Sequence, residues 1–301
     1  MYRFRRKGWT PSVLDGIVLA ALAALVIFVV QGIETKVHYR WNWSAIPRYL
    51  VRYDPEAGSW GAGVLLQGLM TTIRLSVWTA FLATVIGVIM GLWRVSSRLF
   101  RRMVGATFVG VVRNTPPLVL VFIFYYFLSD QIIPLLRLDE ALHRQTPIIQ
   151  ELVGLVAASP MRLNSFLSAV ITLSVYEGAY IAEIVRAGIR SIDRGQWEAS
   201  AALGLSRRQQ MRHIILPQAV QRILPPMAGQ FISTIKDSAI VSVISVQELT
   251  FQGMELMAAT YLTFEIWITV TVLYFVLTFS CSRAAARIET VIRRSPAWGG
   301  R

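Results

Sequence analysis

Residues 64–93 read VLLQGLMTTIRLSVWTAFLATVIGVIMGLW, and Arg74 is the only charged side chain among them. An α-helix of this length extends about 45 Å, which exceeds the roughly 30 Å of hydrocarbon in a bilayer. The stretch therefore predicts a membrane-spanning helix, and with it an integral membrane protein.

The composition of the whole chain agrees with this prediction. Of its 301 residues, 54% are hydrophobic and only 16% are charged, whereas soluble domains carry about a quarter of charged residues. The net charge of +13 raises the possibility of nucleic-acid binding. However, only three of the 30 basic residues are lysines, and the basic residues cluster at the ends of apolar runs, as in membrane proteins.

Six segments have the length and apolarity of membrane spans, and we expect an all-α integral membrane helical bundle of six transmembrane helices: 13–33, 64–93, 104–128, 165–187, 224–246 and 264–282. The first lacks a small-residue cleavage site, so it is predicted to be a retained helix and not a signal peptide. Pro116-Pro117 and Pro225-Pro226 are expected to interrupt or start the third and fifth spans. Residues 146–158 are amphipathic and too short to span, which favours a position against the outer membrane interface.

The distribution of basic residues predicts the orientation. The N-terminus, the second-to-third and fourth-to-fifth links and the C-terminal tail together hold 19 Lys and Arg, against 7 in the opposite loops. The positive-inside rule places both termini and the fourth-to-fifth link in the cytoplasm.

That link, residues 196–217, has the pattern of two short helices. Residues 198–203 are good helix formers, Gly204 is a helix stop, and Ser206 is placed to cap a second helix. At four-residue spacing, Trp197, Ala201 and Leu205 are predicted to share one apolar face suited to a groove on a partner. The alternative is an amphipathic helix that lies on the inner leaflet.

The spacing Glu198-Ala199-Ser200, Gly204, Ile214, Leu216-Pro217 resembles the signature of ABC importer permeases. From about Gly63 to Glu289, about three quarters of the chain, the sequence is similar to the polar amino-acid branch of this family. The stretches that carry this similarity are 113–118, 178–189, 215–219, 236–244 and 248–250. The resemblance implies a five-helix type I importer core, to which the first helix is an addition. It also implies three regions: an N-terminal helix and outer loop (1–62), the permease domain (63–289) and a cytoplasmic tail (290–301).

The resemblance further implies a permease subunit in the bacterial inner membrane that works by alternating access. Its partners would be a cytoplasmic ATPase dimer that binds ATP and Mg²⁺, an extracytoplasmic solute-binding protein and a second permease subunit, identical or paralogous. The residues implied in coupling to the ATPase are Trp197, Glu198, Ala199, Ala201, Gly204, Leu205 and Arg208.

Charged residues deep within predicted spans are costly and mark functional sites. Arg74, Arg113, Glu177, Lys236 and Asp237 come from four spans and lie about 14–18 Å from the span ends, as a shared central cavity requires. We hypothesise that Arg113 and Lys236 bind a substrate α-carboxylate and that Glu177 or Asp237 binds the ammonium. Arg74 and Thr115 complete the expected substrate-binding set. The alternative is ion pairing between helices, as expected for Glu183 and Arg186.

The motifs of other classes are absent from the sequence. It contains no Walker A loop, no H-E-x-x-H and no G-x-S-x-G, and its histidines are scattered, so neither an enzyme nor a metal site is expected. An ion-coupled secondary transporter that uses Glu177 and Asp237 is the alternative function. The sequence leaves open which amino acid is carried.

Overall fold

The computed structural model describes residues 13–294 except 38, 56, 57, 130, 132, 134 and 136. It consists of two units, residues 1–44 and 45–301. In the first unit, α1 (Val13–Val37) is an apolar helix, and Trp41 and Trp43 stack beyond it with ring centroids 5.9 Å apart.

The second unit begins with a short helix and a hairpin. A turn of 3-10 helix (Trp43–Ala45) leads into α2 (Ile46–Leu50), β1 (Val51–Asp54) and β2 (Ser59–Ala62). The strands are antiparallel, and Tyr53 lies opposite Trp60 with their rings 5.3 Å apart. Two four-residue strands are the one addition to the predicted all-α fold among the described residues.

Helices of very different lengths make up the rest of the unit: α3 (Val64–Arg94), α4 (Leu99–Asn114), α5 (Pro117–Ile123), α7 (Leu138–His143), α8 (Pro147–Val156), α9 (Leu163–Arg190), α10 (Arg194–Ala202), α11 (Arg207–Gln209), α12 (Leu216–Asp237), α13 (Leu249–Thr260) and α14 (Thr263–Arg294). Short turns connect them: π-helical Phe124–Ser129 and Gln210–Ile215, and 3-10 helical Pro160–Arg162 and Ser238–Ile244. The predicted all-α membrane bundle is confirmed.

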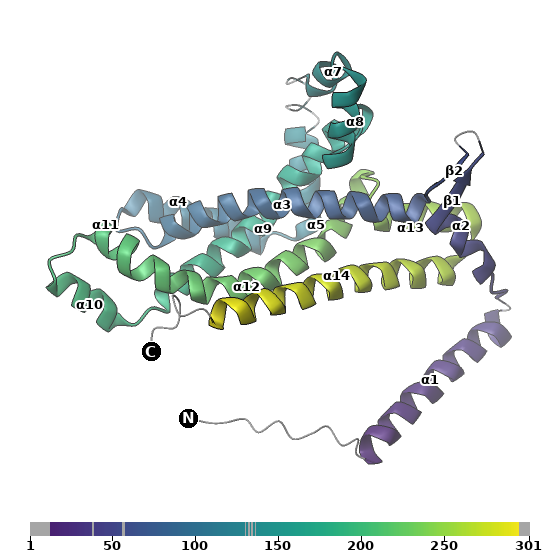
Figure 1. The fold of residues 1–301 in the computed structure, drawn as a ribbon, viewed down its shortest axis with the longest axis horizontal. Coiled ribbons are helices and arrows are strands. Elements are labelled where there is room, and N and C mark those ends of the chain that lie inside the picture. The colour runs from purple at the N-terminus through teal and green to yellow at the C-terminus, as the bar shows by residue number, and fades with distance from the viewer. Residues whose placement is uncertain are drawn as a thin grey trace. The chain divides into compact units, whose positions relative to one another are not determined.

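Helix α9 is the centre of the bundle, and it packs against α3, α4 and α12. Its buried apolar residues, including Ile181 and Val185, join those of α3 and α12 in one core. In Figure 1, α10 lies at one end of this bundle and the hairpin at the other, while α7 and α8 project from its side.

Glycines allow α3 and α9 to approach closely. A β-carbon on Gly91 would lie 2.7 Å from Val185 Cβ, and one on Gly87 would lie 2.9 Å from the Gly178 carbonyl oxygen. Such distances are shorter than van der Waals contact, so only glycine fits at either position.

The number of predicted spans needs correction. Four described helices are long and apolar enough to cross a membrane: Val13–Gly32, Val64–Arg94, Pro160–Arg190 and Thr263–Thr290. The predicted span 104–128 is instead a pair, Leu99–Asn114 and Pro117–Phe127, bent by 110°; counted as one span, it brings the total to five. Pro116 and Pro117 lack backbone donors, which explains the break after Asn114.

The predicted span 224–246 is divided between two elements. Helix α12 ends at Asp237, and the apolar residues that follow form the 3-10 helix Ser238–Ile244. Neither part is by itself long and apolar enough to count as a membrane span. Pro225 and Pro226 lie inside α12, so the expected interruption at this pair is wrong.

Helix α8 agrees with the prediction of a short helix within 146–158. It spans ten residues, and Ile148, Leu152 and Leu155 on it are exposed. No described helix partner covers these three side chains.

Candidate functional site

The predicted cytoplasmic link forms an elbow of two short helices, α10 and α11. The Asp193 carboxylate caps α10 by accepting a hydrogen bond from the Gly195 amide at 2.7 Å. At the other end, the Gly204 amide donates to the Ala201 carbonyl at 2.9 Å and the Leu205 amide to the Ser200 carbonyl at 3.2 Å. These two bonds form a Schellman motif, in which Gly204 adopts φ +77°. Gly204 is the helix stop that the sequence predicts.

The second helix of the elbow starts at a capping box. The Gln209 amide donates to Ser206 Oγ at 3.5 Å, and the Ser206 amide donates to Gln209 Oε1 at 2.9 Å. This arrangement satisfies two backbone donors at once. The predicted cap at Ser206 is therefore confirmed.

The predicted apolar face of the elbow needs correction. Helix α10 ends at Ala202, so Leu205 lies beyond the Schellman turn and not on the same face as Trp197 and Ala201. Trp197 packs against the core that contains Ile189 and Ile215, and only Ala201 of the three is exposed.

The exposed surface of the elbow is formed by other side chains. Leu203, which the sequence analysis did not single out, is 79% exposed. Leu203 lies directly before the predicted helix stop Gly204, and this position in the sequence could have indicated that its side chain is exposed. Among the other residues predicted to couple to an ATPase, those exposed to solvent are Glu198, Ala199, Gly204 and Arg208. Glu198 accepts from Arg194 at 3.3 Å on this surface.

A second polar group lies between α9 and α12 and is centred on Glu177. The Glu177 side chain is fully buried, and its Oε2 accepts a hydrogen bond from Gln230 Nε2 at 2.5 Å. Its Oε1 is buried and accepts no hydrogen bond from any described residue. The side chains of Thr234 and Asp237 on α12 are near enough to interact with this carboxyl group, and Lys236 interacts with Asp237 in turn.

Arg113 approaches the same side of α9 from the end of α4. Its guanidinium lies 5.1 Å from the centre of the Tyr180 ring and 4.0 Å from the Glu183 carboxylate. Thr115, two residues further, is half-buried and donates to the Val111 carbonyl at 2.8 Å. On α9, the two residues that Arg113 approaches, Tyr180 and Glu183, lie about one and two helical turns beyond Glu177.

Glu183 is the centre of an ion-pair cluster. It binds Arg186 on its own helix, as the sequence predicts, and also Arg94 at the end of α3. With Arg113, three cations surround one carboxylate.

The structure does not bring Arg74 to the Glu177 group. Arg74 donates to the carbonyls of Met70 and of Gly154 on α8. It lines an open pocket of about 930 Å³ that also includes Gln150 and Glu151, and none of the other four predicted charges lines this pocket. The position of α8 over α3 is a long-range contact that sequence spacing does not indicate.

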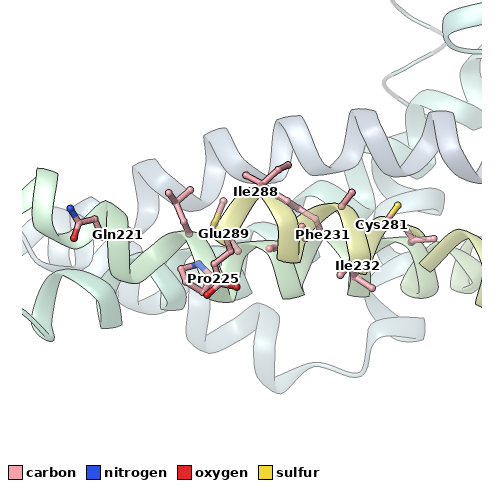
Figure 2. Close-up of a pocket in the computed structure, with 13 residues that line it drawn as sticks. Gln221, Pro225, Phe231, Ile232, Cys281, Ile288 and Glu289 are labelled. Atoms are coloured by element: carbon pink, nitrogen blue, oxygen red, sulfur yellow. The ribbon is translucent and has the colours of Figure 1, made fainter. Parts of the chain in front are cut away.

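A further pocket is unrelated to the predicted residues. It is an apolar groove of about 640 Å³ between α12 and α14, lined by Phe231, Ile232 and Ile288 among others (Figure 2). Cys281 is half-buried and lines this groove.

Sequence reasoning missed Gln230 and Thr234, the polar side chains that accompany the predicted charges Glu177 and Asp237. Gln230, Thr234 and Asp237 are spaced four and three residues apart, so they share one face of α12. That spacing was a signal in the sequence. The contact between Tyr180 and Arg113 joins two helices, and no pattern in the sequence indicates it.

Comparison with known proteins identifies the family. Residues 83–294 match the family model described as "Binding-protein-dependent transport system inner membrane component". The chain is 35% identical over 226 residues to the glutamine transport system permease protein of Escherichia coli, which covers 75% of this chain and 91% of that protein. It is 30% identical over 231 residues to the arginine transport system permease protein of Bacillus subtilis, covering 76% and 92%.

Solved structures agree with the sequence matches. A crystal structure of an amino acid ABC transporter with histidines has a TM-score of 0.64 and 28% identity, and the match covers 84% of this chain and 99% of that one. The methionine ABC transporter in an inward-facing conformation shares the fold, with a TM-score of 0.56 over 76% of this chain and 95% of that one, at 19% identity. These matches support an ABC importer permease over the ion-coupled alternative. The chain therefore belongs to the inner-membrane components of binding-protein-dependent transport systems, multi-pass permease subunits that work with an ATPase and a solute-binding protein.

Proposed function

We propose that this permease subunit forms the translocation path of an ATP-driven importer of a polar amino acid. Two similar permeases carry glutamine and arginine in their names, and the histidine-containing structure is that of an amino acid transporter. The observation that carries the proposal is the buried Glu177 carboxylate with one oxygen free of hydrogen bonds from the described residues. A buried carboxylate in this state favours a cationic partner, and the ammonium group of an amino acid is one.

The residues around Glu177 suit the two charged ends of an amino acid. In this proposal Glu177 and Asp237 bind the ammonium, while Arg113 and Lys236 bind the α-carboxylate and Thr115 lies beside it. Arg113 is available for this because its side chain is 40% exposed and Glu183 is already bound by two other arginines. Arg74 would contact the substrate earlier, in the pocket beneath α8.

Movement would reach this site from the elbow. ATP and Mg²⁺ bound by the partner ATPase dimer drive its closure, and the exposed face of the elbow, with Glu198, Gly204 and Arg208, receives the motion. Residues 198–217 then shift α9 and α12, which begin or end at the elbow, so that the cavity alternates between the two sides of the inner membrane. Both termini and the elbow lie in the cytoplasm in this arrangement, and a second permease subunit completes the pore.

Uptake by the complete transporter in proteoliposomes tests the proposal. Glutamine, arginine, glutamate and histidine are offered in turn to the parent and to the Glu177→Gln and Arg113→Ala variants. We expect one polar amino acid to be taken up in an ATP-dependent manner and both variants to lose at least about tenfold in uptake. The matched control is Glu140→Gln, an exposed carboxylate on α7. Unchanged uptake in both variants contradicts the assigned site, and ATP-independent uptake contradicts the function.

A further inference from the structure

Two hollows at one end of the bundle are lined by arginines and share three of them. One has a volume of about 300 Å³ and is lined by the end of α3 and by α4 and α9. The other, of about 420 Å³, extends to the elbow. We call them together the basic cleft, defined by Arg94, Arg102, Arg186, Arg190, Arg194 and Arg207. Among the described residues, no Asp or Glu lines either hollow.

The carboxylates nearby neutralise only part of the charge of the basic cleft. Arg94 and Arg186 share Glu183, and Arg194 pairs with Glu198. Within the described part of the chain, Arg102 and Arg190 form no ion pair. Arg207 lies over the Trp197 ring at 5.7 Å. The cleft thus carries a surplus of positive charge in a concave site, which favours an anion.

The type of side chain narrows the class of anion. Every cation in the cleft is a guanidinium, whose planar set of donors matches the oxygens of a phosphate group in pairs. Guanidinium groups from three helices and the elbow converge on the two hollows. A phosphate group could therefore accept hydrogen bonds from more than one element at once.

The surroundings of the cleft indicate where the phosphate comes from. Arg94 and Arg190 are the last residues of two helices that can span a membrane, so they lie where phospholipid headgroups lie. Met103 lines the first hollow, and Met103 and Phe100 on α4 are 58% and 76% exposed. An apolar surface directly beside a cationic hollow suits a molecule that has a phosphate and an acyl chain.

We propose that the basic cleft binds the phosphate of an anionic phospholipid, with an acyl chain along Met103 and Phe100. Trp197 and Arg207 of the elbow line the second hollow, so the bound lipid touches both the bundle and the elbow. Lipid binding itself is independent of the transported solute. An effect of the bound lipid on the coupling of ATP hydrolysis to uptake would rest on the proposed function of the elbow.

Native mass spectrometry of the complete transporter, purified from nanodiscs, tests the proposal. The nanodiscs contain phosphatidylcholine with or without phosphatidylglycerol, and the Arg102→Gln/Arg190→Gln variant is compared with Arg98→Gln/Arg101→Gln. The control loses the same charge from exposed arginines of the α4 start that line neither hollow. We expect phosphatidylglycerol retention to fall about tenfold in the first variant and less than about twofold in the control.

Three outcomes overturn the proposal. Equal retention in the two variants shows that the lipid is held by general surface charge. Protection of the parent against thermal unfolding by inorganic pyrophosphate to the same extent as by phosphatidylglycerol shows that the site takes a soluble phosphate. Loss of the ATPase from the Arg102→Gln/Arg190→Gln complex, with lipid retention unchanged, shows that these arginines meet the partner. The Arg102→Lys/Arg190→Lys variant, which keeps the charge, is expected to retain an intermediate amount of lipid.

Discussion

The elbow and the Glu177 group are stabilised by opposite kinds of contact. In the elbow, the caps of α10 and α11 join residues two to five positions apart, and most side chains are exposed. Around Glu177, the bond from Gln230 joins residues 53 positions apart, and the carboxylate is fully buried. Local caps define the shape of the elbow, whereas the Glu177 group depends on how α9 and α12 are placed. A shift of α9 relative to α12 would therefore change the buried site, while the capping bonds of the elbow join only residues within it or next to it.

The largest expected effect is a loss of uptake without a loss of solute binding, which would distinguish the function of the elbow from that of the Glu177 group. Replacing Glu198 and Gly204 with lysine should reduce ATP-coupled uptake by at least about tenfold, because a side chain at Gly204 meets a cost of about 1–2 kcal/mol in the left-handed conformation and the bulk lies on the exposed face. Uptake and ATP hydrolysis are measured together in proteoliposomes. Solute binding, measured by calorimetry, should remain within about twofold of the parent. Uptake at the parental rate would show that the elbow takes no part in coupling ATP hydrolysis to transport.

The second prediction concerns the buried site. Glu177→Gln keeps the shape of the side chain and removes its charge, so solute affinity should fall by about tenfold or more, as for lost hydrogen bonds to charged groups. Calorimetric binding to the purified transporter measures this. Basal ATP hydrolysis, which the proposed function assigns to the partner ATPase docked on the elbow, should stay unchanged. A variant that binds solute normally but fails to hydrolyse ATP would reverse the roles of the two regions.

A third, smaller effect tests the packing of α3 against α9. Gly91→Ala should lower the free energy of unfolding by about 1–3 kcal/mol, because the added methyl group would lie 2.7 Å from Val185 Cβ. Thermal unfolding in detergent measures the loss. Gly110→Ala is the matched control: no atom lies within 4 Å of a β-carbon at Gly110, so alanine there should be neutral or stabilising. Equal loss in both variants would mean that glycine matters for reasons other than helix contact.

The smallest effect is confined to the elbow. Ser206→Ala removes the capping box at a cost of about 1 kcal/mol, which corresponds to roughly fivefold faster amide exchange at Gln209. Ser206→Asp keeps an acceptor and should exchange at the parental rate. Hydrogen exchange with mass spectrometry resolves the segment. Faster exchange that spreads into α12 would show that the elbow is not an independent unit.

The sequence predicted the elements whose causes are local. The cap at Ser206, the stop at Gly204 and the break at Pro116 each follow from a few neighbouring residues, and all three are present. The pair Pro225-Pro226 was expected to act like Pro116-Pro117, yet α12 continues through it. Tertiary contacts on both sides of α12 outweigh the local cost there.

The composition of the candidate site was only partly predictable. Periodicity indicates which residues share a helix face, and Gln230, Thr234 and Asp237 follow that rule. Which helices face one another is set by contacts far apart in sequence, such as Gly91 against Val185. For this reason the charges of four spans could be identified individually, but the separation of Arg74 from Glu177 could not.

The uninterrupted apolar stretch of α1, residues 16–30, has a mechanical consequence. Every described side chain in its span is exposed within its own unit, and apolar residues occur on all sides. Rotation about its long axis presents the same surface to surrounding acyl chains, so lipid exerts no torque on it. The bilayer determines how deep such a helix lies but not its rotation about its own axis. A helix of this kind anchors the chain in the membrane without transmitting rotation.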